Sequence, residues 1–278
     1  MKETLKKLHK TLYPIFDPGE SDAIIRLIFH YLKGWSLTDM LIHQDDELSP
    51  YIKGKIDEIL ARLIKHEPIQ YIIGEARFHG MDFKIKPGVL IPRPETDELV
   101  DIIIDENKNR EDLRVLDLCA GSGCIAIALA RNLPFSNVTA VDISPVAIEV
   151  AKENSDILHT KIKLKQEDIF QWTPSETFDI IVSNPPYIMD KEALTMEKNV
   201  LDYEPHEALF VRDENPLEFY NRIADIAESS LVEGGNLYLE INPLTVDSLK
   251  VMLAEKGFSD ISVLKDTSAK QRFISCRK

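Results

Sequence analysis

The first 65 residues have apolar positions that recur every three or four residues, which is the spacing of amphipathic helices. Two runs carry this pattern: Ile24, Ile25, Leu27, Ile28, Tyr31 and Leu32 in the first, and Ile56, Ile59, Leu60, Leu63 and Ile64 in the second. Polar residues that favour helix N-caps precede such runs at Ser21, Ser36 and Ser49. The pattern predicts a small bundle of short helices, and no catalytic constellation appears in it.

The pattern changes between Pro68 and Pro94. Two short stretches, 70–73 and 81–85, are rich in β-forming residues and are separated by Gly74 and Gly80. This arrangement predicts a β-hairpin that connects the helical bundle to the rest of the chain.

After Pro94, short apolar runs typical of buried strands alternate with helical runs. Strands are predicted at 114–118, 138–141, 162–164, 178–182 and 236–241, and helices at 124–131, 145–154, 217–231 and 246–256. Alternation of this kind predicts a parallel sheet with helices on both faces. Two final strands, 261–264 and 273–276, are predicted to close it as an antiparallel pair. The fold class is therefore α/β, with a Rossmann-like, mostly parallel sheet of seven strands.

Composition limits the classes of protein to consider. The 278 residues are 44% apolar and 29% charged, which is the balance of a globular protein, and no apolar run reaches the roughly 18 residues of a membrane span. Residues 1–7 lack the features of a secretion signal, so we expect a cytoplasmic protein. The formal charge of −14 argues against an undirected nucleic-acid binder. Small buried side chains are expected at Cys119, Cys124 and Cys276.

The ends of the predicted parallel strands are where an open α/β sheet binds ligands. The first strand leads into 117–124, where Gly121 and Gly123 allow a tight turn and a close approach of a ligand to backbone N–H groups. A single Gly-x-Gly is a weak signal, and a plain strand-to-helix turn is the alternative.

Acidic residues follow the next two strands. Asp142 comes roughly 20 residues after the glycines, where nucleotide folds hold a ribose, and Ser144 with Pro145 already supplies a helix cap that would leave Asp142 free. Asp168 is suited to accept the exocyclic amine of adenine, although alone it would be a turn residue. Asp117 would repel a pyrophosphate and attract an ammonium or sulfonium group. The site therefore favours S-adenosylmethionine over NAD.

The fourth strand runs directly into Asn184-Pro185-Pro186-Tyr187, which is the most specific feature of the sequence. An amide or aromatic amino nitrogen is a poor nucleophile because its lone pair is delocalised. The Asn184 side-chain oxygen and the Pro185 carbonyl can accept hydrogen bonds from the two N–H bonds of such a nitrogen, and Tyr187 can cover the planar group. The alternative is a simple turn, as Asn-Pro pairs often form. The motif predicts methyl transfer to a planar nitrogen.

Across almost its whole length the chain resembles the bacterial release-factor glutamine N5-methyltransferases, the HemK or PrmC family. Besides the tetrapeptide and the glycine loop, the resemblance rests on the segments 68–74, 91–96 and 203–205, which read Pro-Ile-Gln-Tyr-Ile-Ile-Gly, Ile-Pro-Arg-Pro-Glu-Thr and Tyr-Glu-Pro. The segment 93–96 favours this family over enzymes that methylate a ribosomal-protein glutamine. Two places depart from the family pattern: Val211 to Pro216 replaces a glycine-rich segment, and Asn242 stands where glycine is more usual.

The resemblance implies a helical substrate-docking domain at 1–75, a β-hairpin linker at 76–93 and a class I methyltransferase domain at 94–278. The implied substrate is the glutamine of the Gly-Gly-Gln motif of peptide chain release factors. It also implies that Arg93 to Thr96 lie at the mouth of the site, while Thr96 has an alternative role as a helix cap. No metal, direct nucleic-acid contact or membrane contact is expected, and the protein is expected to be a monomer.

The predicted site residues fall into two groups. Catalysis is assigned to Asn184, Pro185 and Tyr187, and substrate binding to these three with Pro186. Cofactor binding is assigned to Asp117, Cys119, Ala120, Gly121, Ser122, Gly123, Asp142, Ile143, Asp168, Ile169 and Asn184. Three alternatives remain at this point: an N6-adenine DNA or RNA methyltransferase, a ribosomal-protein glutamine methyltransferase, and a non-catalytic cofactor-binding scaffold.

Overall fold

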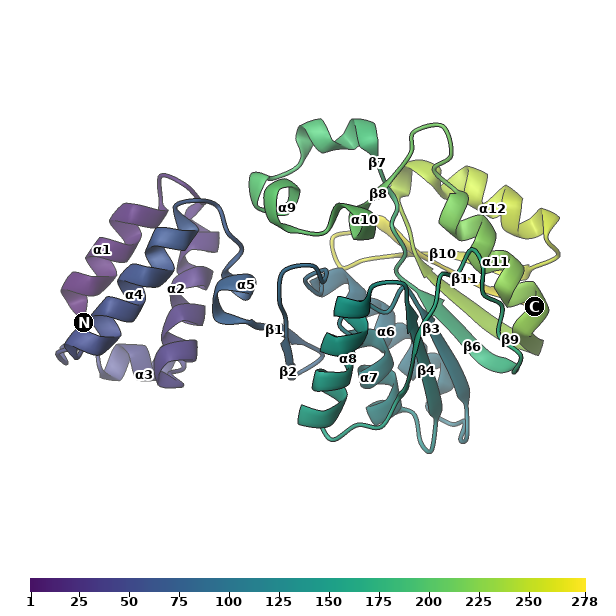
Figure 1. Cartoon of the computed structure of the whole chain (residues 1–278), viewed down its shortest axis with the longest axis horizontal. Helices are drawn as coiled ribbons and strands as arrows, with labels where there is room; N and C mark the ends of the chain where they lie inside the picture. Colours follow the sequence, from purple (N-terminus) through teal and green to yellow (C-terminus); the bar gives the residue numbers. More distant parts are fainter. The chain divides into compact units, whose positions relative to one another are not determined.

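The computed structural model describes residues 1–278 and divides into two compact units (Figure 1). The first unit consists of Met1–Gly74 together with Glu197–Tyr203, and the second of Glu75–Met196 and Glu204–Lys278. The chain therefore returns to the first unit once, a feature that no pattern in the sequence anticipates. The functional division at residues 75 and 93 stays a prediction.

The first unit is a bundle of short helices, as the apolar spacing predicts. Its helices are α1 (Lys2–Leu12), α2 (Pro18–Lys33), α3 (Leu37–Ile42), α4 (Pro50–Leu63), α5 (Ile69–Ile73) and the returning α9 (Lys198–Tyr203). Leu8, Leu12, Ile28, Phe29 and Ile56 lie at its centre with almost no exposed surface. Helices α1, α2 and α4 each bury several apolar residues on one face, and they can do so only by packing against one another.

The N-caps of this bundle agree with the sequence at two of the three predicted positions. Ser36 caps α3 and Ser49 caps α4 through their hydroxyl oxygens. The prediction for Ser21 is wrong, because α2 begins one turn earlier and Ser21 is buried within it. The carboxylate of Asp17 caps that helix instead, with Pro18 at the first helical position, where its missing N–H is not needed.

The predicted hairpin exists, but its first strand begins later in the chain than the sequence pattern predicts. Residues 70–73 are part of helix α5, which ends at Gly74 in the left-handed conformation. The two strands are β1 (Glu75–Phe78) and β2 (Met81–Lys84), paired antiparallel. The β-branched residues of 70–73 are helical because Gly74 can adopt a positive φ and end a helix there.

The second unit is built on the predicted seven-stranded sheet, and the fold class is confirmed. Its order is β10-β11-β9-β6-β3-β4-β5, with β9, β6, β3, β4 and β5 mutually parallel and β11 antiparallel to both neighbours. The strands are β3 (Arg114–Leu118), β4 (Asn137–Asp142), β5 (Lys163–Gln166), β6 (Phe178–Ser183), β9 (Leu231–Glu240), β10 (Ser259–Lys265) and β11 (Gln271–Arg277).

Helices cover both faces of this sheet (Figure 1). One face packs on α11 (Glu218–Ser230) and α12 (Val246–Glu255), and the other on α6 (Pro94–Asn107) and α7 (Cys124–Asn132). Helix α8 (Pro145–Ile157) follows β4 and contacts β4 and β5. Successive residues of β3 point to opposite faces, so Val115 joins one core and Leu116 the other.

A smaller set of elements stands beyond the end of β6. It comprises β7 (Ile188–Met189), the 3-10 helix η1 (Asp190–Thr195), α10 (His206–Leu209) and β8 (Phe210–Val211), with β7 and β8 paired in parallel. The unusual segment 211–216 begins in β8, where Val211 is buried and paired with Met189. No helix of the chain is both long and apolar enough to cross a membrane.

Candidate active site

The glycine loop between β3 and α7 is shaped by positive φ angles at Cys119 (61°), Gly121 (54°) and Gly123 (77°). A Cβ at Gly123 would lie 3.0 Å from the Cβ of Ala151, so glycine lets α7 approach α8 closely. A Cβ at Gly121 would meet nothing within 4 Å, so there glycine serves the backbone conformation alone. The sequence prediction of a tight turn at these two glycines is confirmed.

The cysteines differ from one another in exposure. Cys124 and Cys276 are buried, as expected, and burial raises the pKa of each thiol to about 12. Cys119 is only half-buried, so the prediction of burial is wrong for this residue. Its positive φ turns the residue out of the strand and towards a cavity, which it lines. Because burial also raises the Cys119 pKa, none of the three thiols suits a nucleophile.

Asp142 ends β4 and fastens the glycine loop. Its Oδ2 accepts a hydrogen bond of 2.8 Å from the N–H of Gly121, and its Oδ1 accepts one of 2.9 Å from that of Ser144. Ser144 caps α8, as predicted, so Asp142 is free of that capping role, although each of its oxygens accepts one backbone hydrogen bond. Burial raises the Asp142 pKa, although the hydrogen bonds from the two N–H groups act to lower it. Each oxygen keeps room for one more donor.

Asp168 lies in a turn two residues after β5. Its Oδ1 accepts a hydrogen bond from the N–H of Phe170 and its Oδ2 accepts one from the side chain of Gln171, both at 2.9 Å. Hydrogen bonds of this kind are typical of a turn residue, which is the alternative to a contact with the adenine amine. Asp168 nevertheless lines the same cavity as Asp142 and Gly121. Its contact with the exocyclic amine of adenine remains a prediction.

The tetrapeptide after β6 is held at its tyrosine by three hydrogen bonds. The Tyr187 hydroxyl donates to Oε1 of Glu240 at 3.0 Å, its N–H donates to the Leu209 carbonyl at 3.2 Å, and its carbonyl accepts from the Asn242 side chain at 3.0 Å. Burial, with the charge of Glu240, raises the Tyr187 pKa, so the phenol stays protonated. Tyr187 is therefore rigid, and it does not line the cavity.

The other end of the tetrapeptide is oriented by Thr96. The Asn184 side-chain N–H donates to Oγ1 of Thr96 at 3.2 Å, and this hydroxyl donates to Oε2 of Glu240 at 2.7 Å. The Asn184 side-chain oxygen and the Pro185 carbonyl accept no hydrogen bond from the chain. Thr96 lies in the first turn of α6 but caps no helix, so its alternative role is excluded.

Arg93 precedes α6 and forms an ion pair with Glu204 at 2.6 Å. Glu204 is 2% exposed at its side chain and also accepts a hydrogen bond from the N–H of Ile91. The pair joins two of the segments on which the sequence resemblance rests, 91–96 and 203–205. Arg93 and Thr96 both line the cavity, whereas Pro94 and Glu95 do not. The position of the segment 93–96 at the mouth of an active site remains a prediction.

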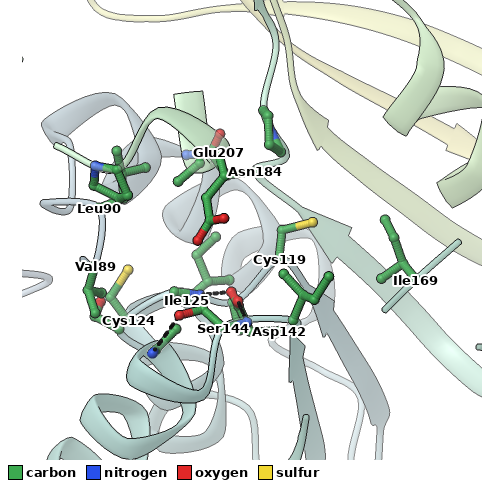
Figure 2. A pocket seen from close by; sticks show the side chains of 18 of the residues that line it. Val89, Leu90, Cys119, Cys124, Ile125, Asp142, Ser144, Ile169, Asn184 and Glu207 are labelled. Carbon is green, nitrogen blue, oxygen red and sulfur yellow. Dashed lines mark hydrogen bonds between the residues drawn. The ribbon is translucent and has the colours of Figure 1, made fainter. Parts of the chain in front are cut away.

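These elements surround one cavity of about 240 Å³ (Figure 2). Asn184 and Asp142 lie on opposite sides of it. Predicted residues in its lining are Cys119, Ala120, Gly121, Ser122, Asp142, Ile143, Asp168, Ile169, Asn184 and Pro186. The structure does not bring Asp117, Gly123, Pro185 or Tyr187 to the lining. The functional roles of all these residues remain predictions.

Three other residues in the lining are ones that the sequence pattern does not predict. Leu90 precedes α6, Phe219 belongs to α11, and Glu207 belongs to α10. Glu207 reaches into the cavity and makes no hydrogen bond or ion pair, while its charge raises the pKa of Asp142 (Figure 2). No strand end precedes Glu207, so the rule about strand ends could not find it. Its position two residues after Tyr203-Glu204-Pro205 is the one signal that could have drawn attention to it.

Asp117 lies under the glycine loop with no exposed surface. Its Oδ2 accepts a hydrogen bond of 3.1 Å from the N–H of Ala126, while its Oδ1 has no partner. Burial raises the Asp117 pKa to about 8. An unsatisfied buried acceptor is costly, so a donor or cation at the floor of the loop would be stabilising.

The charge of the cavity also favours a positively charged ligand. Its lining carries four acidic side chains against one cation, which is paired: Asp142, Glu167, Asp168 and Glu207 against Arg93. A site of this kind repels a pyrophosphate and attracts a ligand with net positive charge. S-adenosylmethionine, with its sulfonium and ammonium groups, fits these residues.

Comparisons with known proteins decide the family. The model of the PrmC N-terminal domain matches residues 17–74, and that of the methyltransferase small domain matches residues 80–203. A release factor glutamine methyltransferase of Bacteroides thetaiotaomicron is 42% identical over 98% of both chains. One of Streptococcus pneumoniae is 45% identical over 80% of this chain and 79% of its own. The chain belongs to the release factor glutamine methyltransferases.

Membership of this family agrees with the fold and with the cofactor. The Thermus thermophilus 16S rRNA N2 G1207 methyltransferase, solved with AdoMet and guanosine, aligns with a TM-score of 0.54 over 73% of this chain and 49% of its own. Its 22% identity supports the shared fold alone. The family assignment makes this chain an S-adenosylmethionine-dependent methyltransferase, as the glycine loop and the tetrapeptide predict.

Proposed function

We propose that this protein transfers the methyl group of S-adenosylmethionine to the side-chain amide N5 of the glutamine in the Gly-Gly-Gln motif of peptide chain release factors. The single observation that carries this proposal is the pair of unoccupied acceptors at Asn184 and Pro185 beside the acidic cavity. The relatives from Bacteroides thetaiotaomicron and Streptococcus pneumoniae carry the name of this activity.

The cofactor is held, in this proposal, by the residues between the glycine loop and the ends of β4 and β5. Asp142 accepts the ribose hydroxyls with the acceptor positions that Gly121 and Ser144 leave open. Asp168 accepts the adenine amine, and Ile143 and Ile169 line the adenine end of the cavity. The remaining residues assigned to this site are Asp117, Cys119, Ala120, Ser122, Gly123 and Asn184. The bound cofactor supplies an electrophilic methyl group on a sulfonium.

The tetrapeptide binds and activates the amide nitrogen. The Asn184 side-chain oxygen and the Pro185 carbonyl each accept one N–H of the substrate amide, which orients its nitrogen lone pair. As positive charge grows on that nitrogen, each hydrogen bond strengthens towards roughly 1.5–3 kcal/mol. Two such bonds contribute roughly 10²–10⁴ in rate, and alignment contributes more. The new N–CH₃ bond forms as the S–CH₃ bond breaks, which leaves S-adenosylhomocysteine. The methylated nitrogen then loses one proton to solvent, so this scheme needs no dedicated general base and no metal.

Pro186 and Tyr187 are proposed to shape the space that receives the substrate amide, here called the substrate slot, without taking part in the chemistry. Pro186 lines the cavity, and the two prolines stiffen the backbone that presents the Pro185 carbonyl. Tyr187 contributes through its rigid position, since its hydroxyl, N–H and carbonyl are all engaged. We propose that its ring bounds the slot while its hydroxyl takes no part in proton transfer.

The helical residues 1–75 are proposed to dock the release factor, with 76–93 as linker and 94–278 as the methyltransferase domain. In support, helix α3 leaves Leu37, Leu41 and Ile42 between 57% and 68% exposed, an apolar surface that nothing in the first unit covers. The charge of −14 favours a protein substrate over direct nucleic-acid binding. We propose a cytoplasmic monomer that makes no membrane contact.

The test is incorporation of labelled methyl groups from S-adenosylmethionine. Purified release factor should be labelled, and a release factor with alanine in place of the Gly-Gly-Gln glutamine should not. Ribosomes and nucleic acid serve as competing substrates in parallel reactions. Label in nucleic acid with unlabelled release factor would support an adenine methyltransferase, and label in a ribosomal protein would support the other glutamine enzyme. If none of these substrates is labelled, the result would support a protein that binds the cofactor without catalysing methyl transfer.

A further inference from the structure

Two consecutive hydrogen bonds connect Glu240, at the end of β9, to the tetrapeptide. Oε2 of Glu240 accepts from the Thr96 hydroxyl at 2.7 Å, and Oγ1 of Thr96 accepts from the Asn184 side chain at 3.2 Å. Glu240 is 1% exposed and Thr96 is 2% exposed. The three residues come from β9, from α6 and from the loop after β6, so they meet only in the folded protein.

The donors and acceptors in the hydrogen-bonded series Glu240–Thr96–Asn184 fix the orientation of the Asn184 amide. The hydroxyls of Thr96 and Tyr187 each donate to one oxygen of Glu240, so both oxygens act as acceptors and the single Thr96 proton is committed to Glu240. Oγ1 of Thr96 can then only accept, and the group that faces it must be the NH₂ of Asn184. The Asn184 side-chain oxygen is thereby turned away from Thr96. If Thr96 were free to donate, either face of the amide could be bound equally well.

The same carboxylate also holds the far end of the tetrapeptide. Its second oxygen, Oε1, accepts from the Tyr187 hydroxyl at 3.0 Å. Burial raises the Glu240 pKa, while the hydroxyls of Thr96 and Tyr187 act to lower it. The charge of Arg272, which lies on the neighbouring strand β11 next to the residue paired with Glu240, also acts to lower it. Glu240 therefore bridges Thr96 and Tyr187 and spans the tetrapeptide from Asn184 to Tyr187.

We propose that Glu240 is a positioning residue for methyl transfer: through Thr96 it turns the Asn184 side-chain oxygen, rather than its NH₂ group, towards the substrate amide. This inference rests on the proposed function. With the amide reversed, the Asn184 NH₂ would face the substrate NH₂, and two donors cannot bond. The expected loss is that of one hydrogen bond to a growing charge, roughly 10- to 100-fold in rate.

A matched pair of variants tests whether the Thr96 hydroxyl orients the Asn184 amide. Thr96→Val keeps the shape of the side chain and removes the hydroxyl, whereas Thr96→Ser keeps the hydroxyl. We expect Thr96→Val to lower kcat roughly 10- to 100-fold, with the calorimetric Kd for S-adenosylmethionine changed less than about threefold. Thr96→Ser should retain kcat within about threefold. Equal kcat in Thr96→Val and the wild-type enzyme would overturn the proposal.

Glu240→Gln provides the second test, because it keeps volume and can still bond both hydroxyls. The Tyr187 hydroxyl has no acceptor besides residue 240, so the glutamine oxygen stays with Tyr187 and the glutamine NH₂ donates to Thr96. The Thr96 proton must then turn towards Asn184 and favours the reversed amide. We expect a loss of kcat similar to that of Thr96→Val, with a thermal unfolding midpoint that shows the variant to be folded. Full activity in folded Glu240→Gln would contradict the positioning role.

A measurement independent of activity uses the side-chain amide signal of Asn184 in ¹H–¹⁵N spectra, identified by its absence in Asn184→Ala. Hydrogen exchange of this amide should be at least about tenfold faster in Thr96→Val and Glu240→Gln than in the wild-type protein or Thr96→Ser. Unchanged exchange would overturn the proposal even if activity fell. If the wild-type enzyme leaves release factor unlabelled, the proposed function fails, and the exchange rates still decide whether the orientation is fixed as stated.

Discussion

The side-chain amide of Asn242 donates a hydrogen bond of 3.0 Å to the backbone carbonyl of Tyr187, and a second of 2.7 Å to Oε2 of Glu192. Asn242 is buried two residues after the end of β9, and its side-chain oxygen accepts from the N–H of Leu244. The sequence resemblance expects glycine at this position. This chain therefore ties its tetrapeptide to β9 with a side chain that a glycine could not supply.

Replacing Asn242 by glycine should loosen the tetrapeptide. We expect Asn242→Gly to lower the free energy of unfolding by about 1–2 kcal/mol, because buried hydrogen bonds are lost and the unfolded chain gains entropy. Turnover should fall several-fold. Asn137→Gly is the matched control, since Asn137 is exposed and its side chain makes no hydrogen bond. Denaturant unfolding that gives the same value for both variants would contradict a role for the Asn242 amide.

Removal of the Asp142 carboxylate should weaken cofactor binding. In Asp142→Ala the ribose acceptors are lost and the N–H of Gly121 loses its partner, so we expect a Kd for S-adenosylmethionine about 10- to 100-fold higher by calorimetry. Asp156→Ala on α8 is the control, because Asp156 is exposed and contacts only Lys152 through its side chain. Equal affinity in Asp142→Ala and Asp156→Ala would mean that the ribose contact is misplaced.

Asn184→Ala should affect turnover far more than binding. It removes one of the two acceptors that act on the substrate nitrogen, so we expect kcat to fall about 100-fold or more. The KM for release factor and the Kd for the cofactor should change only a few-fold. Initial rates with labelled methyl groups measure this. Full activity would mean that another group holds the nitrogen.

The buried Asp117 should make the stability of the free protein depend on pH. Burial raises its folded-state pKa to about 8, whereas an unfolded Asp titrates near 3.9. Between these values the folded protein holds a proton that the unfolded chain has lost, so the Asp117 contribution to stability falls as pH rises from about 4 to about 8.

The variant that tests this is Asp117→Asn, which cannot ionise. Its unfolding midpoint should drop less between pH 5 and pH 8 than that of the wild-type protein, both measured without cofactor. Parallel curves for the two proteins would show that Asp117 does not carry a raised pKa. The same variant should bind S-adenosylmethionine more weakly, because Asp117 can lose its proton beside a positively charged ligand, whereas asparagine cannot become negatively charged.

Several features were predictable because they depend on local chemistry. The strand 114–118 and the alternation of strands and helices follow from apolar runs and turn residues. The caps at Ser36 and Ser49 follow from side chains that reach their own helix. The errors at Ser21 and at 70–73 are also local: a second capping residue, Asp17, lies four positions earlier, and Gly74 ends a helix where a strand was expected.

By itself, the sequence determined the sheet, the glycine loop and the tetrapeptide, because each depends on residues that are near one another in the chain. Only the tertiary structure decided that Thr96 meets Glu240 across 144 positions, that Glu207 enters the cavity, and that Asn184 has its amide orientation set. Hydrogen bonds between distant segments leave no periodicity in a sequence. They arise once the core has packed and brought α6, β6 and β9 to the same edge of the sheet.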